Sequence, residues 1–275
     1  GAGKTVGQDL LHLALAMFVC FFFYREGEAL ARALTPRTRL VYLVNPNNPT
    51  GTAFSTAELE SFLEAAGPNV PVLLDEAYCE YARGLSGYPD TLPEWTRRFP
   101  HLVVLRTFSK VYGLAGLRVG YCAARPEFIA GLERVRPTFN VSLAAQRAAE
   151  ASLADQEFVR RSAALVRDEM PRLLARLTAL GFKGDLSAAN FLFLKSPVRA
   201  GRLFAQLRDR GVLIRPLDSY GLPCRIRVTV GLPWQNDAFV AATADALKAG
   251  QTDGLALRVR PTGPGRRAGP TGGCA

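Results

Sequence analysis

Short apolar runs alternate with polar turns and amphipathic stretches from about residue 39 onward. Runs rich in aliphatic residues predict buried strands at residues 40–44, 70–74, 102–105 and 119–123. Between the first two runs, Ser55-Thr56-Ala57-Glu58 forms a capping box and predicts a helix that extends to about Ala66. Because strands and helices that alternate in this way indicate crossover connections, we predict an α/β domain with a mainly parallel sheet.

The second half of the chain begins with helical periodicity and continues with shorter elements. Residues 154–180 predict a long helix that links two domains and is interrupted or kinked near Pro171. The elements after it predict a smaller α+β domain, with strands at 191–194, 212–214 and 225–230 and helices at 199–210 and 234–248. Residues 261–275 contain eight Gly and Pro residues, which is typical of disorder. The predicted parts are a large domain, a small C-terminal domain and a disordered tail, over residues 1–153, 154–248 and 249–275.

The net charge of +10 raises the question of an acidic partner. The arginines are scattered and form no basic stripe with interleaved aromatic residues, so we expect no nucleic-acid partner. An anionic, phosphorylated ligand accounts for the charge more simply, and so does an arginine enrichment without functional meaning. The five cysteines form no CxxC pair and only two histidines are present, so we predict no metal site. Isolated cysteines in apolar runs are typical of buried packing in a reducing compartment, and we predict a cytoplasmic protein.

The N-terminal region offers two other interpretations. Residues 10–24 are almost continuously apolar, but they are fewer than the roughly 18 to 20 residues that span a bilayer. No small-residue cleavage site follows them, so we predict a buried helix and no membrane partner. Gly1-Ala2-Gly3-Lys4-Thr5 resembles the end of a phosphate-binding loop, GxxxxGK[ST], without a strand before it. A nucleotide-binding module is therefore one alternative function.

The main group of reactive side chains follows the strand at 102–105. In the segment 105–121, LRTFSKVYGLAGLRVGY, the residues Thr107, Ser109, Lys110 and Arg118 lie within twelve positions. Hydroxyl groups and a forked guanidinium bind a phosphate well, and a lysine amine can attack an aldehyde. Pyridoxal phosphate carries both groups, so we predict this cofactor. The alternative is a strand, a Gly-rich turn and a surface Lys-Arg pair, because short motifs also match by chance.

The wording S-K-x-Y-G-L-A-G-L-R-x-G-Y resembles the Schiff-base lysine segment of the class I/II aminotransferases, and most of all that of the histidinol-phosphate aminotransferases. NPNNPTG at 45–51, DEAY at 75–78 and R-V-T-V-G from Arg227 follow in the order of this family. The resemblance is good over residues 28–247 and poor over 1–27, where Gly7-Gln8-Asp9 faintly resembles the phosphate-binding turn of the family. We expect a shortened N-terminal part that lacks the segment with the ring-stacking aromatic residue.

The resemblance implies a fold, an assembly and the role of the lysine. The fold would be the pyridoxal-phosphate-dependent aminotransferase fold (type I), and the assembly a homodimer with sites at its interface. Lys110 would hold the cofactor as a Schiff base and then move a proton between the substrate carbon and the cofactor. Thr107, Ser109 and Arg118 would bind the phosphate.

Three further residues would complete the cofactor site. Asp75, at the end of a strand, is the candidate that keeps the pyridine nitrogen protonated, so that the ring accepts electrons. Asn48 and Tyr78 match the pair of the family that donates hydrogen bonds to the phenolic oxygen. Each has a structural alternative: Asp75 as a turn cap or surface ion-pair partner, Asn48 as a turn residue, and Tyr78 as a core aromatic residue.

The substrate side of the resemblance rests on the small domain. Arg225 and Arg227 lie two residues apart and so share one face of a strand. The family pattern assigns the substrate carboxylate to Arg227, the substrate phosphate to Arg215 and a substrate-side position to Asn190. The alternative is that these arginines only solvate a sheet edge.

The resulting function is a transamination between a small-molecule amino donor and a 2-oxo acid. The motif sequences are most similar to those of enzymes that use histidinol phosphate and 2-oxoglutarate, in histidine biosynthesis, so the resemblance implies these substrates. An aromatic-amino-acid aminotransferase or a threonine-phosphate decarboxylase of the same fold would use nearly the same cofactor residues. A non-catalytic remnant of such an enzyme is an alternative of a different class.

Overall fold

The computed structural model describes residues 27–258 and Cys274. The predictions for the phosphate-loop-like start, the Gly7-Gln8-Asp9 turn and the apolar segment 10–24 lie outside this part of the chain. The chain forms two compact units: Gly1–Asn48 with Thr52–Arg161, and Pro49–Gly51 with Ser162–Ala275. The division after Arg161 falls eight residues beyond the end of the predicted large domain at residue 153. The functional division into a cofactor-binding and a C-terminal domain stays a prediction.

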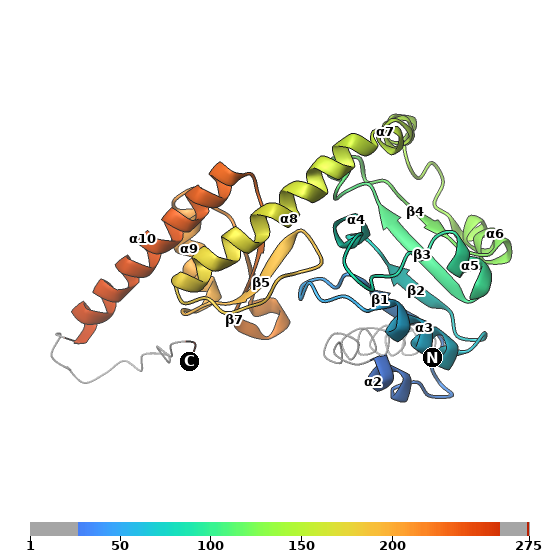
Figure 1. The fold of residues 1–275 in the computed structure, drawn as a ribbon, viewed down its shortest axis with the longest axis horizontal. Coiled ribbons are helices and arrows are strands. Elements are labelled where there is room, and N and C mark those ends of the chain that lie inside the picture. Colours follow the sequence, from blue (N-terminus) through green and yellow to red (C-terminus); the bar gives the residue numbers. More distant parts are fainter. Residues whose placement is uncertain (1–26, 259–273, 275) are drawn as a thin grey trace, which may run out of the picture. The chain divides into compact units, whose positions relative to one another are not determined.

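A four-stranded sheet in the order β1-β2-β3-β4 forms the centre of the first unit (Figure 1). β1 (Val41–Val44), β2 (Val72–Asp75) and β3 (Leu102–Thr107) are parallel, as predicted, whereas β4 (Gly120–Ala123) pairs antiparallel with β3. In the register of the parallel strands, Val44 lies opposite Asp75 and Asp75 opposite Leu105. The polar residues that follow these strands therefore share one edge of the sheet, where parallel sheets bind their ligands.

The helices of this unit precede, connect and follow these strands. They are α2 (Gly27–Arg32), α3 (Thr56–Ala66), α4 (Cys79–Ala82), α5 (Glu94–Arg98), the 3-10 helix η1 (Ala115–Leu117), α6 (Pro126–Val135), α7 (Leu143–Ala154) and the first turns of α8 (Gln156–Ala179). The predicted capping box of α3 is confirmed, because the N–H of Glu58 donates to Ser55 Oγ and the Glu58 carboxylate accepts from the Ser55 N–H. α4 and α5 were not predicted, since about one turn of helix is too short to show a period of 3.6 residues.

Two apolar clusters hold the first unit together. In one, side chains of β1, β2 and β3 pack with those of α2 and α3, and Leu43, Leu63 and Leu74 are fully buried. The other contains Phe108 and Val111, which flank Ser109 and Lys110 in the sequence and pack with residues of α7 and α8. Burial of these two neighbours fixes the backbone on both sides of Lys110 and leaves the lysine itself exposed.

His101, the residue before β3, is buried and contacts Leu63 and Phe99 of the first apolar cluster. Its Nε2–H donates to the Leu63 carbonyl at 3.1 Å, and its Nδ1 has no hydrogen-bond partner among the residues that the structure describes. Burial lowers the pKa of His101; the bond to Leu63 opposes this effect and the charge of Arg125 adds to it. The neutral imidazole is therefore the form that the folded protein favours.

We expect this histidine to make the free energy of unfolding depend on pH. Below about pH 6.5 the unfolded chain binds a proton at His101, whereas the folded chain does so only at lower pH, so stability falls as the pH decreases. Urea unfolding of the wild type and of His101→Gln, between about pH 7.5 and about pH 5.5, measures this contribution. The variant should lose less stability over this range. Equal losses in the two proteins would contradict the assignment.

The second unit contains a three-stranded antiparallel sheet in the order β5-β7-β6 (Figure 1). Its elements are the remainder of α8, β5 (Phe191–Lys195), α9 (Ala200–Arg208), β6 (Arg215–Leu217), the 3-10 helix η2 (Asp218–Tyr220), β7 (Leu222–Thr229) and α10 (Pro233–Arg258). The short segment 49–51 also belongs to this unit, because the Ala188 N–H donates to the Gly51 carbonyl at 2.8 Å. Gly51 has a φ of +75°, and a Cβ there would lie 2.1 Å from Ser187 Oγ, so the motif requires glycine at this position.

Several predictions for the second unit need correction. The strand predicted at 212–214 is wrong: these residues complete the turn after α9, where the Val212 N–H donates to the Leu207 carbonyl, and the strand is β6. β6 is an edge strand and tolerates Pro216, which has no N–H to donate. α8 continues through Pro171 as one helix, and α10 extends to Arg258, into the segment that was predicted to be disordered.

The cysteines also differ from the prediction. Cys224, in β7, forms a disulfide with Cys274, so the interpretation of all cysteines as isolated packing residues is wrong for this pair. Cys79 and Cys122 are free, and Cys79 is buried, as expected for packing residues. Spacing along the sequence could not reveal a bond between residues separated by 50 positions.

Candidate active site

The predicted cofactor residues of the first unit lie at or just after the carboxyl ends of the three parallel strands. Asn48 follows β1, Asp75 is the last residue of β2, and Thr107 is the last residue of β3. Tyr78 and Lys110 each lie three residues beyond these last two strand ends. Parallel pairing of β1, β2 and β3 therefore brings the three segments to the same edge of the sheet.

Lys110 and Tyr78 are in contact. The Lys110 ammonium lies 5.1 Å from the centre of the Tyr78 ring, within the range of a cation–π interaction. Tyr78 is buried, and its ring forms a fixed surface below the exposed lysine. Two residues that the sequence placed in one site, 32 positions apart, are thus neighbours in the structure.

The predicted phosphate-binding residues form a second connected group. Arg118 Nη1 donates to the Ala115 carbonyl at 2.8 Å and makes a long contact of 3.5 Å with Ser109 Oγ. The Ser109 N–H donates to Thr107 Oγ1 at 3.1 Å. Arg118 has a φ of +52° and a ψ of +48°, a left-handed conformation that costs a non-glycine residue about 1–2 kcal/mol. Such outliers are concentrated at ligand-binding sites, which agrees with the predicted role of Arg118.

Asp75 is half-buried and accepts a hydrogen bond on each carboxylate oxygen. The Tyr42 hydroxyl, from β1, donates to Oδ2, and the Ala77 N–H donates to Oδ1 at 3.0 Å. Burial raises the pKa of Tyr42, and the hydrogen bond to Asp75 and its charge raise it further. Tyr42 was not predicted as a site residue. Because side chains alternate along a strand, the sequence predicts that Tyr42 and Val44 share one face of β1. The contact of Tyr42 with Asp75 cannot be predicted in this way, because it depends on the register of β1 and β2.

Behind Asp75, a buried ion pair joins the ends of β2 and β3. Arg106 donates from Nε and Nη2 to Glu76 Oε2 at 2.8 and 2.7 Å, and the Thr91 hydroxyl donates to Oε1 at 2.6 Å. The side chains of Glu76 and Arg106 are only 1% and 8% exposed. Burial raises the pKa of Glu76, and the charge of Arg106 and the hydrogen bonds from Thr91 and Arg106 counter this rise. With three donors on its oxygens, Glu76 is held as the carboxylate partner of Arg106.

A second hydrogen-bonded chain fixes the loop after β1. The Tyr88 hydroxyl donates to the Asn45 carbonyl at 2.8 Å, and the Asn45 N–H donates to the Asp75 carbonyl at 2.9 Å. The Asn45 side chain is fully buried and accepts from the Phe54 N–H. This loop carries Asn48, so these bonds anchor the loop next to the end of β2. Neither Tyr88 nor Arg106 was predicted as a residue that supports the site.

The predicted substrate residues belong to the second unit. Arg215 in β6 and Arg227 in β7 are directly opposite each other, so their side chains share one face of the sheet. The Arg227 guanidinium lies 5.0 Å from the centre of the Phe191 ring, and Arg225 lies at the same distance from Phe193. Asn190 precedes β5, and its carbonyl accepts from the Val230 N–H at 2.9 Å. The structure therefore brings Arg215 and Arg227 together, as a cationic pair next to an aromatic face.

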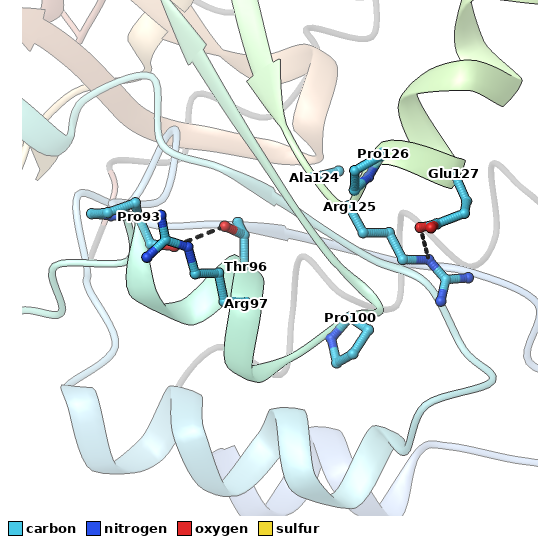
Figure 2. A pocket seen from close by; sticks show the side chains of 8 residues that line it. All are labelled: Pro93, Thr96, Arg97, Pro100, Ala124, Arg125, Pro126 and Glu127. Carbon is cyan, nitrogen blue, oxygen red and sulfur yellow. Dashed lines mark hydrogen bonds and ion pairs between the residues drawn. The ribbon is translucent and has the colours of Figure 1, made fainter.

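A cavity of about 700 Å³ lies elsewhere in the first unit (Figure 2). Its lining consists of Pro93, Thr96, Arg97, Pro100, Ala124, Arg125, Pro126 and Glu127. The Thr96 hydroxyl donates to the Pro93 carbonyl, and Arg125 pairs with Glu127 at 3.9 Å, so these polar groups are engaged with one another (Figure 2). None of the predicted site residues lines this cavity, and we do not place the cofactor there.

A model of the family described as aminotransferase class I and II matches residues 26–242. The chain belongs to this family. The histidinol-phosphate aminotransferase of Anaeromyxobacter sp. (strain Fw109-5) is 47% identical over 228 residues, which are 82% of this chain and 62% of that protein. Histidinol-phosphate aminotransferase 1 of Cupriavidus pinatubonensis is 46% identical over 224 residues, 80% of this chain and 59% of that protein. This chain thus spans about three fifths of the length of these relatives.

Solved structures of the family agree with the fold. Histidinol-phosphate aminotransferase from Sinorhizobium meliloti, in complex with pyridoxal-5′-phosphate, superposes with a TM-score of 0.69 at 29% identity, covering 81% of this chain and 60% of that one. The predicted fold class, the α/β fold of the class I and II aminotransferases, is confirmed, and so is the resemblance to this family. Among the residues that the structure describes, no helix is long and apolar enough to cross a membrane. The same residues contain no group of three or more His, Cys, Asp or Glu side chains that could hold a metal ion.

Proposed function

We propose that the protein is a pyridoxal-phosphate-dependent aminotransferase that transfers the amino group of histidinol phosphate to 2-oxoglutarate, a reaction of histidine biosynthesis. The observation that carries the proposal is the contact of Lys110 with Tyr78, at the strand edge that ends in Asp75. Membership of the aminotransferase family and identities of 46–47% to histidinol-phosphate aminotransferases support it.

The residues at this edge fit the cofactor in their chemistry. Bound pyridoxal phosphate would supply an aldehyde carbon and a protonated ring that accepts electrons from the substrate. Lys110 is exposed and can reach such an aldehyde, while Thr107, Ser109 and Arg118 offer the donors that a phosphate needs. Asp75, which accepts hydrogen bonds from Tyr42 and from the Ala77 N–H, would keep a proton on the ring nitrogen.

The other roles follow from position and residue type. Asn48 and Tyr78 would donate hydrogen bonds to the phenolic oxygen of the cofactor. Lys110 would act as general base when it removes the proton from the substrate carbon and, in its protonated form, as general acid. In the second unit, Arg227 would bind the carboxylate of the 2-oxo acid and Arg215 the phosphate of the amino donor, with Asn190 on the substrate side. The opposed guanidinium groups of Arg215 and Arg227 support two anionic groups as ligands.

We further infer a homodimer in the cytoplasm. Exposed apolar side chains at the end of α6 and in the connection to α7 support a partner surface: Val135 is 76% and Phe139 98% exposed. The free cysteines Cys79 and Cys122 agree with a reducing compartment, whereas the Cys224–Cys274 disulfide counts against it.

Amine specificity tests the function. The full chain, supplied with pyridoxal phosphate and 2-oxoglutarate, should form glutamate with L-histidinol phosphate at least about tenfold faster than with L-histidinol, because a hydrogen bond between charged groups, here Arg215 and the phosphate, contributes about 1.5–3 kcal/mol. L-phenylalanine, assayed by glutamate formation, and L-threonine O-phosphate, assayed by release of CO2, test the related aminotransferase and decarboxylase activities. Faster reaction with either would contradict the proposed substrate. Absence of reaction with every amine would contradict the proposed activity and favour the non-catalytic alternative.

A further inference from the structure

Tyr42 lies one strand away from Asp75 and on the same face of the sheet. In the parallel register of β1 and β2, Tyr42 is opposite Leu73 and Val44 is opposite Asp75, so Tyr42 is the diagonal neighbour of Asp75. Its ring spans this diagonal and its hydroxyl donates to Asp75 Oδ2. The contact joins two half-buried side chains at the edge where the predicted cofactor residues lie.

The hydrogen bonds on Asp75 favour one orientation of its carboxyl group. The donors belong to different segments, a side chain of β1 and the backbone at Ala77, and each binds a different oxygen, so rotation about the Asp75 side-chain bonds would break at least one bond. Each carboxylate oxygen has two lone pairs, so it can accept a second hydrogen bond, for example from an N–H group of a ligand.

Tyr42 is suited to act as a permanent donor. Its pKa is raised by burial first and by Asp75 second, so the phenol keeps its proton throughout the ordinary pH range. A water molecule at this place could exchange with solvent, whereas the Tyr42 hydroxyl is carried by a half-buried ring on β1.

We propose that Tyr42 is a positioning residue, which orients the Asp75 carboxylate toward the protonated nitrogen of a heteroaromatic cofactor ring. The inference rests on the proposed function, because it assumes that this ring is bound between Asp75 and Lys110. Tyr42 touches neither the cofactor nor the substrate in this role and acts through Asp75 alone.

A pair of ligands that differ only at the ring nitrogen tests the role. Pyridoxal 5′-phosphate has this nitrogen, and 1-deazapyridoxal 5′-phosphate has a C–H group in its place, which cannot bond to Asp75. Tyr42→Phe should weaken binding of the first compound about tenfold and of the second less than about twofold, since a hydrogen bond to a charged group contributes on the order of one decade in affinity. Binding is measured by titration of the full chain, without any assay of turnover.

Two controls separate this effect from a general loss of structure. Tyr88→Phe removes another phenol hydrogen bond of the same unit, to the Asn45 carbonyl, and should leave the ratio of the two affinities unchanged. In an Asp75→Asn background, Tyr42→Phe should have little further effect on binding of pyridoxal 5′-phosphate, because the two side chains act as one unit.

The outcomes distinguish the inference from the function on which it rests. Equal losses for the two compounds, or additive effects of the Tyr42 and Asp75 substitutions, would overturn the role of Tyr42 and leave the aminotransferase proposal intact. If the wild-type chain binds neither compound, the proposed cofactor site fails, and the inference fails with it.

Discussion

Replacement of Lys110 by alanine is expected to reduce glutamate formation by at least about a thousandfold. The proposed mechanism assigns to this one amine both the attachment of the cofactor and the proton transfer, and general acid–base catalysis alone contributes about 10²–10⁴-fold. The Lys110→Ala protein should remain folded, because the side chain is exposed and its contact is with the face of the Tyr78 ring. Initial rates with histidinol phosphate and 2-oxoglutarate measure the effect.

Two matched variants define what such a loss means. Lys110→Arg keeps the positive charge above Tyr78 but has no amine that can attack an aldehyde, and we expect it to be as inactive as Lys110→Ala. Lys183→Ala removes an exposed lysine of the second unit and should retain the wild-type rate. An active Lys110→Arg protein would show that only the charge is needed and would contradict the covalent role.

The second large effect concerns the buried ion pair of Arg106 and Glu76. We expect Arg106→Ala to lower the free energy of unfolding by about 3–5 kcal/mol, because it leaves the Glu76 carboxylate buried without its partner. Urea denaturation, followed by a probe in the first unit, measures this loss. Because the pair joins the ends of β2 and β3, the variant should also bind pyridoxal phosphate more weakly.

Comparison with an exposed pair tests whether burial is the reason. Arg98 pairs with Glu60 and Glu64 on the surface and is about half-exposed, so Arg98→Ala should cost less than about 1 kcal/mol. The double variant Arg106→Met with Glu76→Leu should recover most of the stability, because it leaves no buried charge. Similar decreases in the free energy of unfolding for Arg106→Ala and Arg98→Ala would show that the buried pair does not stabilise the protein more than an exposed one.

Local sequence patterns were sufficient to predict most of the strands and the main helix of the first unit. The capping box at Ser55 defined the start of α3, and the apolar runs located β1, β2 and β3 to within two residues. The alternation of strands and helices gave the parallel pairing, because crossover connections allow little else. The antiparallel pairing of β4 was not predicted, although the connection from β3 contains only a short 3-10 helix and no crossover helix, which favours antiparallel strands.

Interactions between residues that are distant in the sequence could not be predicted from such local patterns. β6 begins at Arg215 because residues 211–214 complete a turn, and only the edge position of the strand accommodates Pro216. The disulfide of Cys224 with Cys274 depends on the path of the chain, which no spacing encodes. In both places the tertiary structure, and not local propensity, decides the outcome.

The candidate site was predictable to a similar degree. The residue types after the strand ends identified Asp75, Tyr78 and Lys110, because their chemistry is recognisable without coordinates. Their supporting partners were missed. Tyr42 is recognisable only from the register of β1 and β2, and the role of Arg106 only from its burial against Glu76.

Attachment of the cofactor to one lysine is the claim on which the account depends, and borohydride reduction tests it directly. The sequence contains five lysines, Lys4, Lys110, Lys183, Lys195 and Lys248, so peptide mass mapping can assign a reduced pyridoxyl group without ambiguity. The wild-type chain, incubated with pyridoxal phosphate and reduced, should carry one such group, on Lys110. A group on any other lysine, or none at all, would contradict the proposed site.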